Sequence, residues 1–145
     1  MIRPFIMLVD DEVPFVETMT KRLQKRDLTV ITALSGNEAL EKLAANRNLD
    51  VVILDVKMPG MDGIETLREM KKAFPLTEVV MLTGHATVET AIEGMKLGAY
   101  DYLMKPCDID QLLGKVKEAA KKKRDHEEKI REAKVKEALS MHGLE

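Results

Sequence analysis

Short apolar runs alternate along the chain with longer segments in which apolar residues recur every three or four positions. The short runs are rich in β-branched residues and span 5–9, 28–33, 51–54, 78–82 and 99–104. They show no alternation of apolar and polar positions, which is typical of strands buried on both faces of a parallel sheet. The longer segments have the period of amphipathic helices. Five strand–helix units in this order predict an α/β protein whose single parallel sheet is covered by helices on both faces.

Capping residues predict where several of the helices begin. Asp11 or Glu12 can cap the first helix, and Ser35, with Glu38 at capping-box spacing, can cap the second. The last helix is expected to start near Asp108. These signals agree with the hydrophobic pattern, because each lies between an apolar run and a segment of helical period.

The balance of charge changes near Ala120. Residues 1–120 carry 15 Lys and Arg against 19 Asp and Glu, whereas residues 121–145 carry 8 against 6. We therefore expect a domain over 1–120 and a charged helical extension or linker over 121–145. No Gly or Pro lies between Lys115 and His142, and Ala, Glu, Lys and Arg are abundant there. The last helix is therefore predicted to continue to at least about Glu137, projecting beyond the domain.

Four consecutive basic residues at 121–124 invite a nucleic-acid interpretation. On a helix, however, acidic residues one turn later would pair with them, as Lys121–Asp125, Lys123–Glu127 and Arg124–Glu128. A solvated helix that pairs its own charges is the favoured interpretation. We therefore expect no direct nucleic-acid binding by this segment.

Composition excludes several classes of protein. The 145 residues are 45% hydrophobic and 33% charged, which fits one soluble globular domain. The single Cys107 excludes an internal disulfide and a multi-cysteine metal site. With five aromatic residues and no Trp, a surface for stacking nucleic-acid bases is not expected. No apolar run has the length of a membrane span, so we expect a cytoplasmic protein without a membrane partner.

Polar residues directly follow four of the five expected strands. Asp10 and Asp11 follow the first, Asp55 the third, Thr83 the fourth and Lys105 the fifth. Because ligands bind beyond the carboxyl ends of parallel strands, these side chains are expected to converge on one site. Alone, the first two acids could simply cap a helix and Asp55 could be an ordinary turn residue. Their occurrence at successive strand ends favours a functional site.

Three converging carboxylates indicate a metal-dependent reaction. Such charges repel one another unless a cation lies between them, and oxygen ligands without Cys or clustered His favour Mg²⁺ over Zn²⁺. Asp55 precedes a sharp turn, where an exposed nucleophile is expected. Lys105 would neutralise phosphoryl oxygens, and Thr83 would donate its hydroxyl to them. The residues therefore predict phosphoryl transfer onto a side chain.

The motifs at these strand ends are VDDE, ILDVKMPGMDG, MLTGHA and DYLMKP. In order and at this spacing they closely resemble a bacterial response-regulator receiver domain, over roughly residues 3–120. The resemblance implies a doubly wound, flavodoxin-like (βα)5 fold with a five-stranded parallel sheet. It also implies that Asp55 is the phosphoacceptor, charged by a histidine kinase, a phosphotransfer protein or a small phosphodonor. The role would be that of a switch and not of an enzyme.

The resemblance also implies a ligand set for the cofactor. Asp11 and Asp55 would bind Mg²⁺ directly, together with the backbone carbonyl of Lys57. Asp10 would act on the metal through water.

Further residues match the phosphoryl-binding and switching positions of that family. Thr83 and Lys105 would contact the phosphoryl group, and Gly84 provides the small residue that the family needs beside it. Tyr102 matches the aromatic residue that turns inward on activation, although plain packing in a strand is its alternative. Pro106 is expected to follow a cis peptide bond.

Other functions on a similar fold fit the sequence less well. A Mg²⁺-dependent phosphohydrolase of the haloacid-dehalogenase type needs a carboxylate two residues after its nucleophile, where this chain has Lys57. A nucleotide- or flavin-binding module needs a glycine-rich loop after the first strand, where this chain has Asp10, Asp11 and Glu12. A degenerate receiver that acts only as a scaffold would not need the complete acceptor site.

The output of the switch is left open by the sequence. The chain can act on a downstream protein partner, or it can be the N-terminal receiver of a longer transcriptional regulator with a fused output domain. At coiled-coil spacing, the seam of the last helix is too polar in its middle for a strong zipper, so self-association is expected to be weak.

Overall fold

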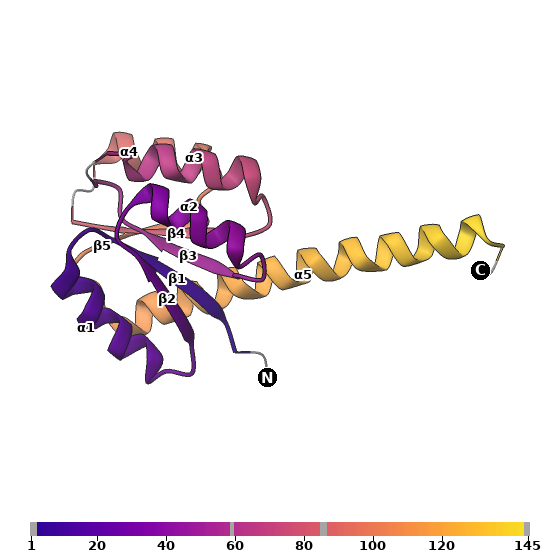
Figure 1. The fold of residues 1–145 in the computed structure, drawn as a ribbon, viewed down its shortest axis with the longest axis horizontal. Coiled ribbons are helices and arrows are strands. Elements are labelled where there is room, and N and C mark those ends of the chain that lie inside the picture. The colour runs from indigo at the N-terminus through magenta and orange to yellow at the C-terminus, as the bar shows by residue number, and fades with distance from the viewer. Residues whose placement is uncertain (1–2, 59, 85–86, 144–145) are drawn as a thin grey trace.

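A computed structural model describes residues 3–58, 60–84 and 87–143 of the chain, and five parallel strands form its single sheet (Figure 1). The strands are β1 (Phe5–Val9), β2 (Thr29–Ala33), β3 (Val51–Leu54), β4 (Glu78–Thr83) and β5 (Asp101–Met104). Their order in the sheet is β2-β1-β3-β4-β5. The order reverses at β1, so that β1 and β3 lie side by side and their carboxyl ends frame the switch point where such folds bind ligands. The predicted doubly wound, flavodoxin-like fold is confirmed.

Helices cover both faces of the sheet. They are α1 (Val13–Gln24), α2 (Gly36–Ala45), α3 (Gly63–Ala73), α4 (Val88–Lys96) and α5 (Ile109–Met141). In Figure 1, α2, α3 and α4 lie on one side of the sheet, and α1 and the first half of α5 lie on the other. This arrangement leaves the loops at the carboxyl ends of the strands free to form a site.

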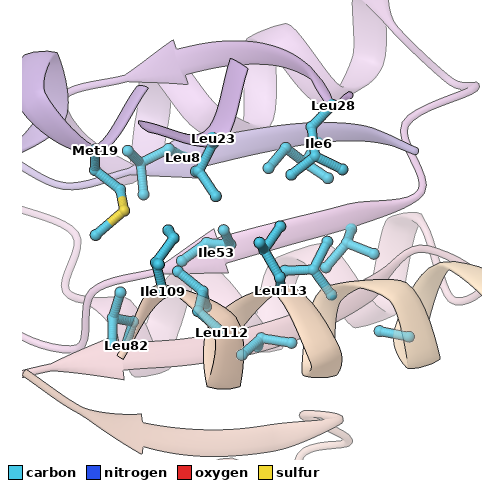
Figure 2. Close-up of a cluster of buried hydrophobic side chains, with 14 of the residues drawn as sticks. Ile6, Leu8, Met19, Leu23, Leu28, Ile53, Leu82, Ile109, Leu112 and Leu113 are labelled. Atoms are coloured by element: carbon cyan, nitrogen blue, oxygen red, sulfur yellow. The ribbon is translucent and has the colours of Figure 1, made fainter. Parts of the chain in front are cut away.

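Two apolar clusters fill the space between the sheet and these helices. Because successive strand residues point to opposite faces, Ile53 packs toward α1 and α5, while Val52 and Leu54 pack toward α2 and α3. Figure 2 shows the first cluster, in which α1 contributes Met19 and Leu23 and α5 contributes residues including Leu112. Both faces of the central strands are therefore apolar, which explains the absence of alternation in their sequence.

The helix starts follow the predicted capping only in part. Ser35 Oγ accepts a hydrogen bond from the Glu38 backbone N–H at 3.1 Å, as predicted. Of the two residues predicted to cap α1, Glu12 occupies the capping position, but its side chain makes no capping hydrogen bond. Its carboxylate lies instead 3.3 Å from the ammonium of Lys105, and Asp10 accepts from the Glu12 backbone N–H at 2.9 Å. The Glu12 side chain thus pairs with the partly buried Lys105 and does not cap the helix.

The last helix runs for 33 residues and projects far beyond the sheet, as Figure 1 shows. The prediction that it continues to at least Glu137 is confirmed, since it ends at Met141. Its apolar positions up to Ala120 pack on the sheet, whereas from Glu128 to the end every described side chain is exposed. No helix within the described residues has the length and apolarity that a membrane span needs.

Ion pairs fasten the middle of α5 to the amino-terminal edge of the sheet. Lys123 is buried and lies 3.3 Å from Asp50, and Arg124 binds the same carboxylate at 2.7 Å. Lys122 pairs with Glu78 at 2.9 Å. We call these five residues the α5 anchor. It lies at the edge opposite the site, because Asp50 directly precedes β3 and Glu78 begins β4.

The anchor changes the interpretation of the basic run. The predicted pairs Lys121–Asp125 and Lys123–Glu127 form, at 2.7 and 3.0 Å. The third predicted pair is wrong, because Arg124 binds Asp50 instead of its helical neighbour. A buried carboxylate that already accepts from the Phe5 backbone N–H offers Arg124 a less hydrated partner than the exposed acid one turn away.

Candidate functional site

The polar residues at the strand ends come together, as the sequence predicts. Asp10 and Asp11 follow β1, Asp55 follows β3, Thr83 ends β4 and Lys105 follows β5. The backbone holds these ends in register: the Asp55 N–H donates to the Val9 carbonyl at 3.0 Å, and the Lys105 N–H donates to the Thr83 carbonyl at 2.9 Å. Backbone hydrogen bonds at the end of the sheet therefore hold Asp55 and Lys105 in place.

A glycine that the sequence analysis did not single out lets the loop after Asp55 fold back. A β-carbon on Gly63 would lie 2.1 Å from the Asp55 carbonyl oxygen, which no side chain can tolerate. The Gly63 N–H also donates to the Val56 carbonyl at 2.6 Å. The first turn of α3 thus packs directly under the acceptor loop. A short-range motif does not predict this, because the clash exists only once the loop has closed.

The three aspartates form one acidic cluster. Carboxylate oxygens of Asp10, Asp11 and Asp55 all lie within 4.8 Å of one another. Asp10 and Asp55 are 1% and 3% exposed, so Asp55 is more buried than the exposed nucleophile that the sequence predicts. Its backbone is enclosed by β1 on one side and by the start of α3 on the other. The other two carboxylates lie beside its side chain.

The carboxyl group of Asp55 lacks part of its hydrogen bonding. Within the described residues, its Oδ1 atom is buried and has no hydrogen-bond partner. Burial and the neighbouring charge of Asp10 raise the pKa of Asp55, and a hydrogen bond from Thr83 and the charge of Lys105 act in the opposite direction. A buried acceptor atom without a donor is unfavourable, so this oxygen is available for an added cation or phosphoryl group.

Lys105 is held over this cluster by three contacts. Its ammonium lies 2.5 Å from Asp10 Oδ2, 3.3 Å from Glu12 Oε1 and 4.0 Å from the centre of the Phe15 ring. Burial opposes its charge, but the hydrogen bond and charge of Asp10, followed by the charge of Asp55, raise the pKa of Lys105. The lysine is therefore a permanent cation beside the acids. Sequence reasoning predicts its place but not Glu12 or Phe15 as partners.

The remaining predicted residues surround the same edge of the sheet. Thr83 is fully buried, and Gly84 beside it has open space where a β-carbon would lie. Tyr102 is half-buried, and its hydroxyl lies 3.1 Å from the Thr90 hydroxyl, which belongs to the capping box that begins α4. An aromatic residue of β5 is thus connected to the start of the neighbouring helix. His85, two residues after Thr83, lies outside the described residues.

Two further expectations concern single backbone positions. Lys57 is exposed two residues after Asp55, and the peptide bond between Lys105 and Pro106 is cis, as expected.

The donor set fits a hard divalent cation. It consists of carboxylate oxygens, one of them buried without a donor, and it includes neither sulfur nor clustered imidazole nitrogen within the described residues. Magnesium prefers oxygen ligands and tolerates a site completed by water, as this partly open cluster would require. A cation here would also relieve the repulsion that raises the pKa of Asp55.

The family model for the response regulator receiver domain matches residues 6–117 of this chain. The chain belongs to this family. The matched residues include β2 to β5, all of β1 except Phe5, and every polar residue of the site described above. The protein is therefore the receiver domain of a two-component signalling switch.

The curated proteins to which this chain is similar include transcriptional regulators. The chain is 40% identical to the transcriptional regulatory protein ZraR of Escherichia coli O157:H7 over 114 residues, which are 79% of this chain and 26% of that protein. It is 36% identical over 119 residues to the DNA-binding transcriptional regulator NtrC of Salmonella typhimurium, which are 82% of this chain and 25% of that protein. The chain thus spans about a quarter of the length of these relatives.

Solved structures support the same assignment. A response regulator receiver domain protein from Clostridium thermocellum superimposes with a TM-score of 0.80 at 38% identity, over 83% of this chain and 97% of that one. A CheY-like receiver domain protein from Methanospirillum hungatei gives a TM-score of 0.80 at 29% identity, over 86% and 99%. The parts of the chain that match are the receiver fold; the projecting half of α5 extends beyond it.

Proposed function

We propose that this receiver accepts a phosphoryl group on Asp55. The observation that carries the proposal is the Asp55 carboxyl group itself, which is buried beside two other acids, within the electrostatic reach of Lys105, and has one oxygen without a donor. A carboxylate in this position gains a partner for that oxygen when a phosphoryl group is added. The other acids and the lysine then surround the added charge.

The transfer is a displacement at phosphorus. One carboxylate oxygen of Asp55 attacks the phosphorus of a phosphohistidine on a histidine kinase or phosphotransfer protein, or of a small phosphodonor. A phosphorus–oxygen bond forms while the bond from phosphorus to the donor's leaving group breaks, and the electron pair goes to that group. In phosphohistidine the breaking bond is phosphorus–nitrogen and the leaving group is the imidazole. Lys105 stabilises the negative oxygens that face it, and Thr83 donates its hydroxyl to another.

The acidic cluster is proposed to bind Mg²⁺. Asp11 and Asp55 would bind the ion directly, with the backbone carbonyl of Lys57, and Asp10 would act through water. When bound, the ion neutralises charge on the phosphoryl oxygens and so allows one anion to approach another.

The switch is proposed to act through Thr83, Gly84 and Tyr102. A phosphoryl group shifts the conformational equilibrium only through contacts that differ between the two states. Thr83 gives such a contact, the small Gly84 leaves room for it, and Tyr102 moves into the space that Thr83 vacates. Because Tyr102 also bonds to Thr90, its movement changes the start of α4.

The output is proposed to be a protein partner or a fused output domain. The names of the curated relatives describe transcriptional regulators, and this chain matches only about a quarter of their length. An N-terminal receiver of a longer regulator, acting in the cytoplasm, is consistent with that match. The boundary near Ala120 and weak self-association through the extension are part of the same proposal. The basic residues 122–124 are engaged by Asp50 and Glu78, which favours a structural role for them over nucleic-acid binding.

The test is phosphorylation by phosphoramidate with and without Mg²⁺, followed by intact mass. The wild-type protein should gain one phosphoryl group that is labile to alkali, and Asp55→Asn should gain none. Asp125→Asn, which changes an exposed aspartate of α5, is the matched control and should behave as wild type. Asp11→Asn should need a higher Mg²⁺ concentration for the same rate. Labelling of Asp55→Asn at the wild-type level would overturn the proposal.

A further inference from the structure

We infer that Phe15 is a positioning residue for phosphoryl transfer: the face of its ring holds the Lys105 ammonium over the acidic cluster. The inference rests on the proposed role of Lys105 in transfer to Asp55. It concerns a residue of α1 that carries no polar group.

The geometry is that of a cation–π contact. The Lys105 ammonium lies 4.0 Å from the centre of the Phe15 ring, well inside the range of about 6 Å over which a ring face attracts a cation. The two residues are far apart in the sequence and meet because the start of α1 and the end of β5 lie at the same edge of the sheet. The Lys105 side chain is only 15% exposed, and the attraction is stronger for a poorly hydrated cation.

The ring is itself held in place. Phe15 is half-buried and packs against the apolar cluster between the sheet, α1 and α5. Its position is therefore determined by the core and not by the lysine. A ring fixed in this way provides a wall against which a long flexible side chain can be ordered.

The ring matters to the lysine because the ammonium has two carboxylate partners, Asp10 and Glu12, that lie in different directions. Asp10 binds the ammonium from within the site, whereas Glu12, whose side chain is 64% exposed, offers a competing carboxylate toward solvent. A lysine side chain has several rotatable bonds and loses considerable entropy when it is ordered. The ring occupies one side of the ammonium and offers it no hydrogen bond, so the N–H groups are directed toward the acids. An ammonium ordered before the phosphoryl group arrives does not have to be ordered during the transfer.

A purely structural role for Phe15 makes a different prediction. If the ring only fills the core, then its size and shape matter and its electron density does not. If it positions the lysine, then electron density at the ring face matters at constant shape. Fluorine substitution separates the two, because fluorine withdraws electrons from the ring face with little change in size.

The experiment introduces mono-, di- and trifluorophenylalanine at position 15 and measures the rate constant for phosphorylation by saturating phosphoramidate in Mg²⁺. We expect the rate constant to fall with each added fluorine, to about one-fifth for the trifluoro ring, which corresponds to about 1 kcal/mol of lost cation–π attraction. Phe15→Tyr should retain the wild-type rate and Phe15→Leu should lose about as much as the trifluoro variant. The same fluorinated residues at Phe74, whose ring contacts Arg47 away from the site, should leave the rate unchanged.

A second series in Lys105→Met shows whether the effect acts through the lysine. In that background the rate constant for phosphorylation should be low and should not change with the number of fluorine atoms. A flat series in the wild-type background, or an equal slope without Lys105, would overturn the positioning role. Neither result would contradict the proposed function, which fails only if Asp55→Asn is still phosphorylated.

Discussion

The carboxyl group of Asp55 is buried beside Asp10, and both burial and that neighbouring charge raise its pKa. A group whose pKa is higher in the folded than in the unfolded protein destabilises the fold when it is ionised. The penalty is complete above the folded pKa and disappears as the pH falls below the unfolded value of about 4. In the absence of a cation, the acceptor site is therefore a source of instability at neutral pH.

This predicts that Asp55→Asn stabilises the metal-free protein. The melting temperature at pH 7 without divalent ions should rise by about 3 °C, the shift expected for about 1 kcal/mol in a domain of this size. The difference should vanish near pH 3, where the wild-type carboxyl group is neutral. Differential scanning calorimetry over this pH range measures it. A variant that melts below wild type at pH 7 would contradict the electrostatic account of the site.

The second prediction at this scale concerns Thr83 and Tyr102. Thr83→Ala should still be phosphorylated, at a rate within about fivefold of wild type, because the net contribution of one hydrogen bond is about 1 kcal/mol. On phosphorylation of this variant, the chemical shift of the Tyr102 ring signal should change by less than half of the change seen in the wild-type protein, because the contact that couples the two residues is lost. The chain has two tyrosines, so ¹³C-tyrosine NMR with Tyr100→Phe for assignment resolves the signal. A full wild-type shift in Thr83→Ala would show that Thr83 does not couple them.

Individual site residues could be predicted where the chain direction alone determines their place. Asp10, Asp55 and Lys105 each directly follow a strand, and parallel strands bring such positions together regardless of side-chain conformation. The contacts of Lys105 with Glu12 and Phe15 could not be predicted in this way. They depend on rotamers and on the packing of α1 against the sheet, which leave no local signal in the sequence.

At the scale of the element, the length of α5 was predictable and its attachment was not. Helix propensity and the absence of Gly and Pro are local properties, and they give the continuous helix that the structure has. The α5 anchor joins residues that are far apart in the sequence: Asp50 binds partners more than seventy positions away, and Glu78 binds Lys122. The basic run therefore has the same sequence whether it binds Asp50 or its own helical neighbours.

The anchor predicts a large effect of Asp50→Asn on stability. Burial opposes the charge of Asp50, but hydrogen bonds from Arg124 and the Phe5 N–H, with the charge of Lys123, lower its pKa. The stability that it contributes is present above the unfolded pKa of about 4 and is lost as the pH falls through the lower folded value. At pH 7 the variant should lose about 3 kcal/mol, because Lys123 keeps its burial and loses a partner.

Hydrogen exchange places this effect in the structure. In Asp50→Asn, exchange should become faster at the Phe5 N–H and in α5 around Lys123, where the hydrogen bonds to Asp50 are weakened. Asp125→Asn removes an exposed pair of the same helix and should change stability by less than about 0.5 kcal/mol. Equal effects of the two substitutions would show that the anchor contributes nothing beyond an ordinary surface pair.

For the whole molecule, the charge pattern predicts a boundary near Ala120, and the α5 anchor adds contacts of Lys122, Lys123 and Arg124 beyond it. Composition changes where the helix surface becomes polar, but a polar side chain can still be buried against a matching charge. The boundary itself stays a prediction, and truncation tests it.

Two truncations separate the contributions of the anchor and the projecting helix. A chain ending at Asp125 keeps Lys122, Lys123 and Arg124 and should melt within about 2 °C of the full chain, because the removed side chains are mostly exposed. A chain ending at Ala120 leaves Asp50 without its cationic partners and should melt markedly lower, by about 8 °C. Both should be phosphorylated when folded. Equal melting temperatures would show that the domain ends at Ala120.

The most direct measurement locates the phosphoryl group. The wild-type protein is phosphorylated with phosphoramidate in Mg²⁺, reduced with borohydride, which converts an aspartyl phosphate to homoserine, and sequenced by tandem mass spectrometry. The account predicts homoserine at position 55, absent when Mg²⁺ is omitted and absent in Asp55→Asn. Homoserine at Asp10, Asp11 or any other position instead of Asp55 would contradict it.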